Sequence, residues 1–153
     1  ITCESNTDFV TDENSYSDTS VEQLLLVERS IYTDRYCFAK NCYQSDKMSK
    51  MEYDIYCKWN DWLSKEFKLR PSGYIYLRCD PEVNVERIEA RSRDGESDIP
   101  IEYLEQLHEN HEEWMTRESS QNIPVLILDV SEDFTGTAAM NNLFSKVKEL
   151  KIS

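Results

Sequence analysis

The sequence predicts an α/β domain in which parallel strands alternate with helices. Three short, nearly continuous apolar runs, at residues 24–27, 73–77 and 124–130, are typical of strands that are covered on both faces. Between and after these runs, apolar residues recur at helical spacing. Because parallel strands need crossover connections, which helices usually supply, this alternation predicts a parallel sheet flanked by helices.

Four helices are expected after residue 48, and three of them have recognisable starts. Ser49 and Glu52 form a capping-box pattern before the first helix, Asp80–Pro81 precedes the second, and Pro100 precedes the third. The last helix is predicted from apolar residues alone. The aromatic residues of the first helix are more typical of a protein core than of a base-stacking surface. The apolar faces of the first and last helices would carry Ile55, Tyr56, Trp59, Trp62, Leu63 and Phe67, and Met140, Leu143, Phe144, Val147 and Leu150.

The composition favours one soluble domain that binds a small molecule or a protein. The chain has 153 residues and a formal net charge of −13, so broad affinity for nucleic acid or an anionic membrane is not expected, because both are polyanions. No apolar run approaches the roughly 20 residues of a membrane span. The five cysteines contain no CxxC pair, which favours reduced, intracellular thiols over a disulfide framework or a zinc site.

The first 23 residues differ in composition from the rest of the chain. They contain several acidic side chains, no Lys or Arg, and many Ser, Thr and Asn. This composition predicts a solvated, disordered acidic arm over residues 1–23, followed by a single domain over residues 24–153.

The tripeptide Glu28-Arg29-Ser30 follows the first apolar run, where a strand would end and a helix begin. Ligands of open α/β sheets gather outside the carboxyl ends of the strands. A carboxylate there can hold Mg²⁺, and a neighbouring guanidinium can hold a hydroxyl or phosphate oxygen. An ordinary helix start with acidic and polar residues explains the tripeptide equally well.

Three arginines, Arg87, Arg91 and Arg93, fall at or near one-turn spacing and precede a polar stretch with a lone glycine, Gly95. They are interpreted as a mobile lid whose guanidiniums converge on phosphate. The alternative, favoured by the spacing alone, is salt bridging on a solvated helix to Glu86, Glu89 and Asp94.

Two further features of the sequence argue against a histidine metal site and against a phosphate-binding loop. His108 and His111 lie one turn apart, but their order is not HExxH and they do not indicate a metal site. A phosphate-binding loop of the form GxxxxGK[ST] is absent from the 153 residues, since none of Gly73, Gly95 and Gly136 is followed by Lys-Ser or Lys-Thr.

Four segments together resemble the deoxyribonucleoside kinases, the family of deoxyguanosine and deoxycytidine kinases. They occur in the family's order over residues 24–150, whereas residues 1–23 do not resemble the family. In chain order they are similar to the stretch with the ERS motif and the base contacts, the arginine-rich lid, the segment after the lid, and the last strand with its adenine-side loop: LLLVERSIYTDRYCFAKN (24–41), RIEARSR (87–93), IPIEYLEQLHENHEEW (99–114) and NIPVLILDVSEDF (122–134).

The resemblance implies transfer of the γ-phosphoryl group of ATP, or of another nucleoside triphosphate, to the 5′-hydroxyl of a deoxynucleoside with Mg²⁺. It implies that Glu28 helps to hold Mg²⁺ and that Arg29 holds the 5′-hydroxyl. Asp34 would bond the base edge and Phe38 would pack on the ring. Glu96 would reach the deoxyribose hydroxyl. The triphosphate would be clamped by the lid, and the donor base would be lined by the last loop: Arg87, Arg91 and Arg93, and Asp133 and Phe134.

The resemblance also implies what the chain lacks. A P-loop kinase-type sheet would be missing its first, central strand, its phosphate loop and its general base, so the chain alone is expected to be inactive. In members that favour thymidine the position of Asp34 is small and apolar, so the substrate expected here is a purine deoxynucleoside or deoxycytidine. A homodimer in the cytoplasm or a mitochondrion is expected. The alternative function is a non-catalytic kinase remnant that binds a protein.

Overall fold

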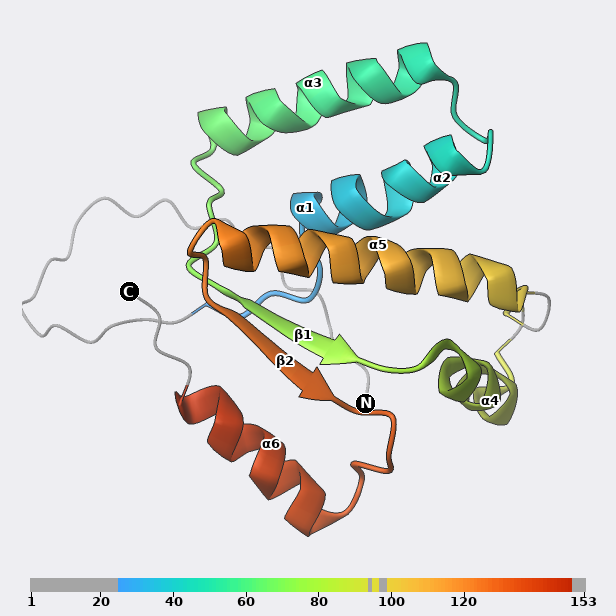
Figure 1. The fold of residues 1–153 in the computed structure, drawn as a ribbon, viewed down its shortest axis with the longest axis vertical. Helices are drawn as coiled ribbons and strands as arrows, with labels where there is room; N and C mark the ends of the chain where they lie inside the picture. Colours follow the sequence, from blue (N-terminus) through green and yellow to red (C-terminus); the bar gives the residue numbers. More distant parts are fainter. Residues whose placement is uncertain (1–24, 94, 97–98, 150–153) are drawn as a thin grey trace, which may run out of the picture.

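The computed structural model describes residues 25–93, 95–96 and 99–149. A nearly continuous helix comes first, is interrupted by a π-helical segment (η1), and is followed by a long helix and by alternating strands and helices (Figure 1). The elements in chain order are α1 (Ile31–Thr33), η1 (Asp34–Ala39), α2 (Lys40–Gln44), α3 (Lys50–Glu66), β1 (Tyr74–Arg78), α4 (Pro81–Arg91), α5 (Ile101–Ser120), β2 (Val125–Asp129) and α6 (Thr137–Glu149).

The described sheet has two parallel strands, β1 and β2, in register from Tyr74 opposite Val125 to Arg78 opposite Asp129. The helices α4 and α5 form the crossover between them, which confirms the predicted α/β fold with parallel strands. Gly73 precedes β1 where a Cβ atom would lie 3.1 Å from the carbonyl oxygen of Pro124. The absence of a side chain therefore lets the segments that lead into β1 and β2 approach each other where the sheet begins.

The core lies between α5, the sheet and η1. Figure 1 shows α5 between the α1–η1–α2 helix and the strands, with α6 on the opposite side of the sheet. Cys37, Trp114 and Met115 are buried together there. The ring of Trp114 meets that of Tyr74 edge to face at a centroid distance of 5.0 Å. Such aromatic pairs add about 0.5–1.5 kcal/mol beyond area burial, so α5 fixes η1 against the sheet.

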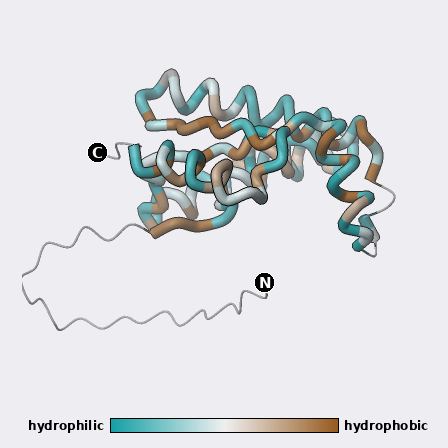
Figure 2. Tube along the Cα trace, turned by 90° about the horizontal axis from the view of Figure 1, so that it is seen from below, coloured by the Kyte–Doolittle hydropathy of each residue, from teal (hydrophilic) through white to brown (hydrophobic). Residues whose placement is uncertain are grey.

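The expected strand at residues 24–27 is not present. Residue 24 lies outside the described residues, and Leu25, Leu26 and Val27 are in no strand and are 84%, 64% and 68% exposed. Figure 2 shows this brown segment where the described chain begins. An apolar run becomes a strand only when a neighbouring strand satisfies its backbone groups. Within the described chain, β1 and β2 pair with each other and neither pairs with this segment.

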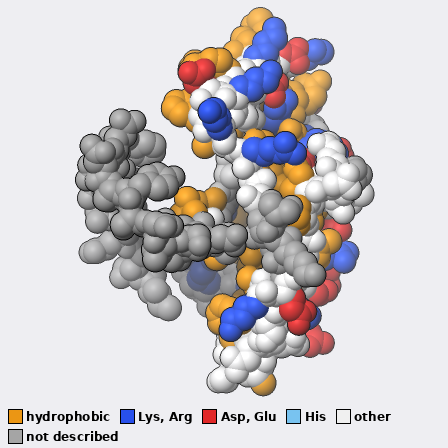
Figure 3. Space-filling model, turned by 90° about the vertical axis from the view of Figure 1, so that its left-hand side faces the viewer, with side chains coloured by type: hydrophobic (Ala, Val, Ile, Leu, Met, Phe, Trp, Pro, Cys, Tyr) orange, Lys and Arg blue, Asp and Glu red, His pale blue; other side chains and the backbone are white. Residues whose placement is uncertain are grey.

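The capping box of α3 is present, with reciprocal bonds between Ser49 and Glu52. The interpretation of its apolar face as core was wrong for much of that face, although Tyr56 is half-buried. Ile55, Trp59 and Trp62 are 53%, 59% and 50% exposed. Figure 3 shows hydrophobic side chains at the top of the molecule, where α3 lies. Helical spacing identifies an apolar face but does not say what covers it, and within the described residues these three side chains stay largely uncovered.

The other helices confirm their predicted starts. Asp80 is the N-cap residue of α4 and Pro81 its first residue, and Pro100 is the N-cap residue of α5. The last helix was predicted to reach Leu150, which lies outside the described residues, as does the predicted acidic arm at 1–23. In the part of the chain that is described, no helix combines the length and the apolar character that crossing a membrane would require.

Candidate active site

An open pocket of about 600 Å³ lies where the chain enters α1, and it gathers four of the predicted site residues. Its lining consists of Glu28, Arg29, Ser30, Ile31, Asp34 and Phe38. All four lie on one segment of the sequence, and the structure shows that they share one pocket. Among the described residues, none of the lid arginines lines this pocket.

The backbone at the pocket entrance is strained and then capped. Arg29 has a φ of 62°, a left-handed conformation that costs a non-glycine residue about 1–3 kcal/mol and that recurs at functional sites. The hydroxyl of Ser30 then accepts bonds from the backbone N–H groups of Tyr32 at 3.2 Å and Thr33 at 3.4 Å. Ser30 thus caps α1, so the start of this helix does not need Asp34 as a cap.

The π-helical turn of η1 positions the base-side residues. Its wider turn is marked by the bond from the N–H of Lys40 to the carbonyl of Arg35, five residues earlier. Asp34 and Phe38 lie on this turn and both face the pocket, and the guanidinium of Arg29 lies 5.1 Å from the centre of the Phe38 ring. Single π-helical turns inside α-helices often occur at functional sites.

Asp34 is exposed and accepts a hydrogen bond from the hydroxyl of Tyr56 on α3. Burial, and then this bond to Asp34, raise the pKa of Tyr56 well above its usual value, so the phenol is a proton donor at neutral pH. The adjacent Arg35 points elsewhere and forms an ion pair with Asp61. Sequence reasoning missed Tyr56 because this residue was assigned to an apolar face that was expected to be core. The available signal was the hydroxyl group that Tyr56 carries within that face.

The lid arginines share an acidic partner. Arg91 forms an ion pair with Glu96, and the Nη1 atom of Arg93 lies 3.9 Å from the Oε1 atom of Glu96. Two of the three arginines therefore meet at one carboxylate, and their convergence on phosphate stays a prediction. Their partner is the predicted sugar-binding residue rather than Glu86 or Glu89, and Asp94 lies outside the described residues.

Arg87 does not share this acidic partner and contacts the loop after β2 instead. Its guanidinium donates to the carbonyl oxygens of Val130 at 2.7 Å, Ser131 at 3.3 Å and Glu132 at 3.1 Å. It also lies 5.3 Å from the centre of the Phe134 ring. Arg87 thus ties α4 to the loop after β2, which is the predicted donor-base loop.

Asp133 organises the same loop. Its Oδ1 atom accepts bonds from the backbone N–H and the hydroxyl of Thr135, at 2.9 and 2.7 Å. These bonds lower the pKa of Asp133 below its usual value. Asp133 and Phe134 are therefore held on one ordered turn next to Arg87.

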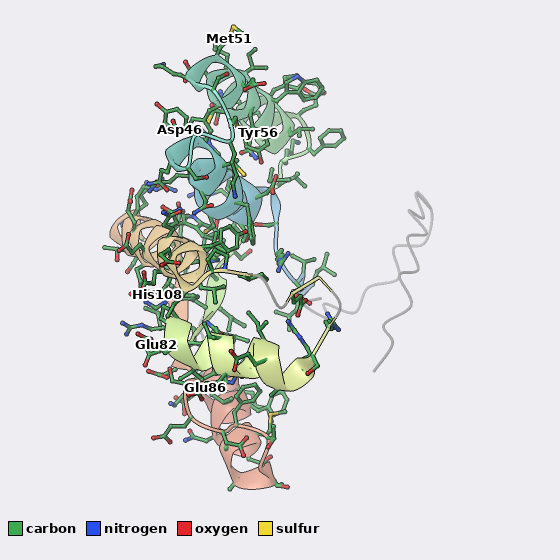
Figure 4. All side chains as sticks on the ribbon, turned by 90° about the vertical axis from the view of Figure 1, so that its right-hand side faces the viewer. Asp46, Met51, Tyr56, Glu82, Glu86 and His108 are labelled. Atoms are coloured by element: carbon green, nitrogen blue, oxygen red, sulfur yellow. The ribbon has the colours of Figure 1, made fainter. Side chains whose placement is uncertain are left out.

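The two histidines of α5 differ in their surroundings. The ring of His111 stacks on Tyr76 at a centroid distance of 5.7 Å, and its Nδ1 atom lies 2.7 Å from the carbonyl oxygen of Leu107. His108 lies on the same helix, toward α4 (Figure 4). No group of three His, Cys, Asp or Glu side chains in the described ranges is arranged to hold a metal ion.

Acidification is expected to destabilise the chain through His111. Burial lowers the pKa of His111 below its ordinary 6.5, so the unfolded chain binds the proton more readily than the folded one. His111 therefore leaves the free energy of unfolding unchanged above pH 6.5. Its protonation in the unfolded chain lowers that free energy as pH drops from there toward the folded-state pKa. Urea midpoints at about pH 7.5 and about pH 5.5 should differ less for His111→Phe, which keeps the stacking, than for the parent. An equal loss in both would assign the pH dependence to other groups.

The chain matches a known protein family over almost its whole length. The family model described as "Deoxynucleoside kinase" matches residues 5–151, almost the whole chain. The chain belongs to the deoxynucleoside kinase family. The match begins at residue 5, so it includes most of the acidic segment that had been set apart from the family.

Curated relatives agree with this membership in the deoxynucleoside kinase family. The chain is 47% identical over 135 residues to deoxycytidine kinase of Mus musculus, covering 82% of this chain and 51% of the relative. It is 41% identical over 137 residues to mitochondrial deoxyguanosine kinase of Xenopus laevis, with 83% and 52% covered. For mitochondrial thymidine kinase 2 of Homo sapiens the identity is 38% over 111 residues, with 71% and 42% covered. The chain thus spans about half the length of the curated relatives it matches.

Proposed function

We propose that this chain is the C-terminal part of a deoxynucleoside kinase. The complete enzyme transfers the γ-phosphoryl group of ATP, or of another nucleoside triphosphate, to the 5′-hydroxyl of a purine deoxynucleoside or deoxycytidine. The observation that carries the proposal is the pocket that brings Glu28, Arg29, Asp34 and Phe38 together. It offers a base-edge acceptor, a ring to pack on and a charged pair for the reacting end of one nucleoside.

The nucleoside lies along this pocket with its base toward η1. Phe38 packs against the base and Asp34 accepts hydrogen bonds from its ring or exocyclic nitrogens. Arg29 holds the 5′-hydroxyl with fixed guanidinium geometry. The left-handed backbone of Arg29 supports this role, because a strained residue is retained only where its surroundings hold it in place.

The exposed carboxylate of Glu28 fits the Mg²⁺ that accompanies a nucleoside triphosphate. Mg²⁺ takes oxygen ligands and commonly binds proteins through one or two carboxylates plus phosphate oxygens and water, and Glu28 is exposed at the pocket. Bound there, the ion supplies charge neutralisation on the phosphates.

The lid residues act on the triphosphate. Arg91 and Arg93 are paired with Glu96 in this structure, and they become available to phosphate when Glu96 turns to the deoxyribose hydroxyl. Their charge then falls on the equatorial oxygens, where charge spreads during phosphoryl transfer. The donor-base side is held by the ordered loop after β2. Asp133 and Phe134 belong to this loop, and Arg87 is bonded to it.

The test is a phosphoryl-transfer assay on a restored kinase, meaning this chain joined to the half of the mouse deoxycytidine kinase that it does not match. Transfer from ATP to deoxycytidine or deoxyguanosine is expected from the restored kinase but not from the 153-residue chain, which has no GxxxxGK[ST] loop to position phosphates. Arg29→Ala should remove this activity, and Arg70→Ala, at an exposed arginine outside the pocket, should not.

Absence of transfer by a folded restored kinase would contradict the proposal. It would then favour the alternative of a non-catalytic remnant that binds a protein. Equal activity of the Arg29→Ala and parent proteins would retain the kinase assignment but remove this pocket from it.

We also propose that the complete protein is an intracellular homodimer that associates through α3. The exposed Ile55, Trp59 and Trp62 form an apolar face on this helix, and aromatic residues of this kind dominate the binding energy of many interfaces.

Light scattering after size exclusion tests the dimer. The restored kinase should have the mass of a dimer, and Trp59→Glu should shift it to the monomer, because loss of a central aromatic commonly costs at least about 2 kcal/mol, a ~30-fold weaker association. Lys58→Glu, which introduces the same charge at the next exposed position of α3, should remain dimeric. A monomeric parent, or a dimeric Trp59→Glu, would overturn the interface.

A further inference from the structure

The hydrogen bond from Tyr56 to Asp34 joins α3 to the base side of the pocket. We propose that Tyr56 is a positioning residue for nucleoside selectivity: its hydroxyl holds one oxygen of the Asp34 carboxylate, so that the other is presented to the base. This inference rests on the proposed function, because it assigns Asp34 to the nucleoside base. Tyr56 itself lies outside the pocket lining.

The orientation of Asp34 needs such a support. Its side chain is exposed and lies on a π-helical turn, where the carboxylate can rotate toward solvent. Tyr56 donates to its Oδ2 atom, and within the described chain this phenol is the donor found on the carboxylate. Figure 4 shows Tyr56 on the side of α3 that faces the α1–η1–α2 helix. Because a carboxylate has two acceptor oxygens, Oδ1 stays available.

A second contact fixes the distance between the two helices. Asn60, one turn after Tyr56 and 4% exposed, donates to the backbone carbonyl of Ile31 at 2.8 Å. Ile31 is part of the pocket lining and follows Ser30. Thus α3 holds the α1–η1 helix at two points a single turn apart, and neither helix can slide without breaking one of these hydrogen bonds.

The competing cation is removed from Asp34 by the same helix. Arg35, the neighbour of Asp34, forms an ion pair with Asp61 of α3 and lies 5.2 Å from the centre of the Tyr36 ring. Asp34 is therefore left to an uncharged donor, Tyr56, which orients the carboxylate without cancelling its charge. A charged acceptor favours bases that present N–H groups, which guanine, adenine and cytosine do at their base edges and thymine does not at its O4 and methyl positions.

The test compares Tyr56→Phe with Tyr53→Phe in the restored kinase. Tyr53 lies one turn earlier on α3 and does not bond Asp34, so it controls for loss of a hydroxyl on this helix. Tyr56→Phe should shift the ratio of kcat/KM for thymidine to that for deoxycytidine about tenfold toward thymidine, as expected for loss of one bond to a charged group. Tyr53→Phe should leave the ratio unchanged. In an Asp34→Ala background Tyr56→Phe should add nothing, because the two residues act as one unit.

The outcomes separate this inference from the proposed function. A folded restored kinase without activity on any deoxynucleoside would reject the proposed function. An active one whose ratio is the same for the parent and Tyr56→Phe, or an additive double variant, would reject the role of Tyr56 alone. In the 153-residue chain, urea midpoints of Tyr56→Phe, Asp34→Ala and the double variant report the contact without any catalysis. Additive shifts there would show that the bond is absent in solution.

Discussion

Asp34→Ala in the restored kinase is expected to raise kcat/KM for thymidine relative to deoxycytidine and deoxyguanosine by about 100-fold or more. In the proposed site the carboxylate would accept hydrogen bonds from base nitrogens, whereas thymine would place O4 and a methyl group against it. A site whose polar group is left unpaired by the wrong substrate discriminates by several powers of ten. Alanine removes both the favourable bond and the repulsion, so activity on the preferred bases falls as activity on thymidine rises.

A competition assay with all four deoxynucleosides measures this change directly. Asp54→Ala is the matched control, because it removes an exposed carboxylate of α3 that pairs with Lys50 and does not line the pocket. Asp34 is not needed as a helix cap, because Ser30 caps α1. An unchanged ratio for Asp34→Ala would make it a structural residue after all.

Arg91→Ala and Glu96→Ala in the restored kinase are expected to have opposite kinetic profiles. In the proposed mechanism Arg91 acts on charge that develops on the transferred phosphoryl group, so its loss should lower kcat by about 10²–10³-fold with little change in nucleoside affinity. Glu96 is proposed to contact the sugar, so its loss should weaken nucleoside binding. Its loss also releases Arg91 and Arg93 from their ion pairs, so kcat should fall much less.

Steady-state kinetics and isothermal titration with deoxycytidine separate the two variants. Lys50→Ala serves as the control for removing an exposed cation, since Lys50 pairs with Asp54 on the surface of α3. If both lid variants lowered kcat and affinity in the same proportion, the division of roles within the lid would be wrong.

Local signals in the sequence predicted the elements that depend on local chemistry. The capping box at Ser49 and the Asp80–Pro81 start need only residues within one turn, and both are present. The run at 24–27 has the same apolar character as β1, but a strand also requires a partner backbone, which periodicity cannot supply. The exposed tryptophans of α3 show the same limit, because an apolar face does not identify what covers it.

The candidate site divides in the same way. Glu28 and Arg29 lie in the same pocket as Asp34, as their closeness in the sequence suggests, because a few consecutive residues carry the whole segment. The π-helical turn at Asp34 is a change of backbone register held by packing of α5 and α3, and no residue pattern in the segment indicates it. The contact from Tyr56 lies 22 residues away along the chain, so it became visible only in three dimensions.

The position of a bound nucleoside tests the central claim most directly. A crystal structure of the restored kinase with deoxycytidine should show the base between Phe38 and Asp34 and the 5′-hydroxyl directed to Glu28 and Arg29. Deoxycytidine found elsewhere, for example in the second pocket of about 350 Å³ between η1, α3 and α5, beside Tyr53, with the first pocket empty, would contradict the assignment of the site.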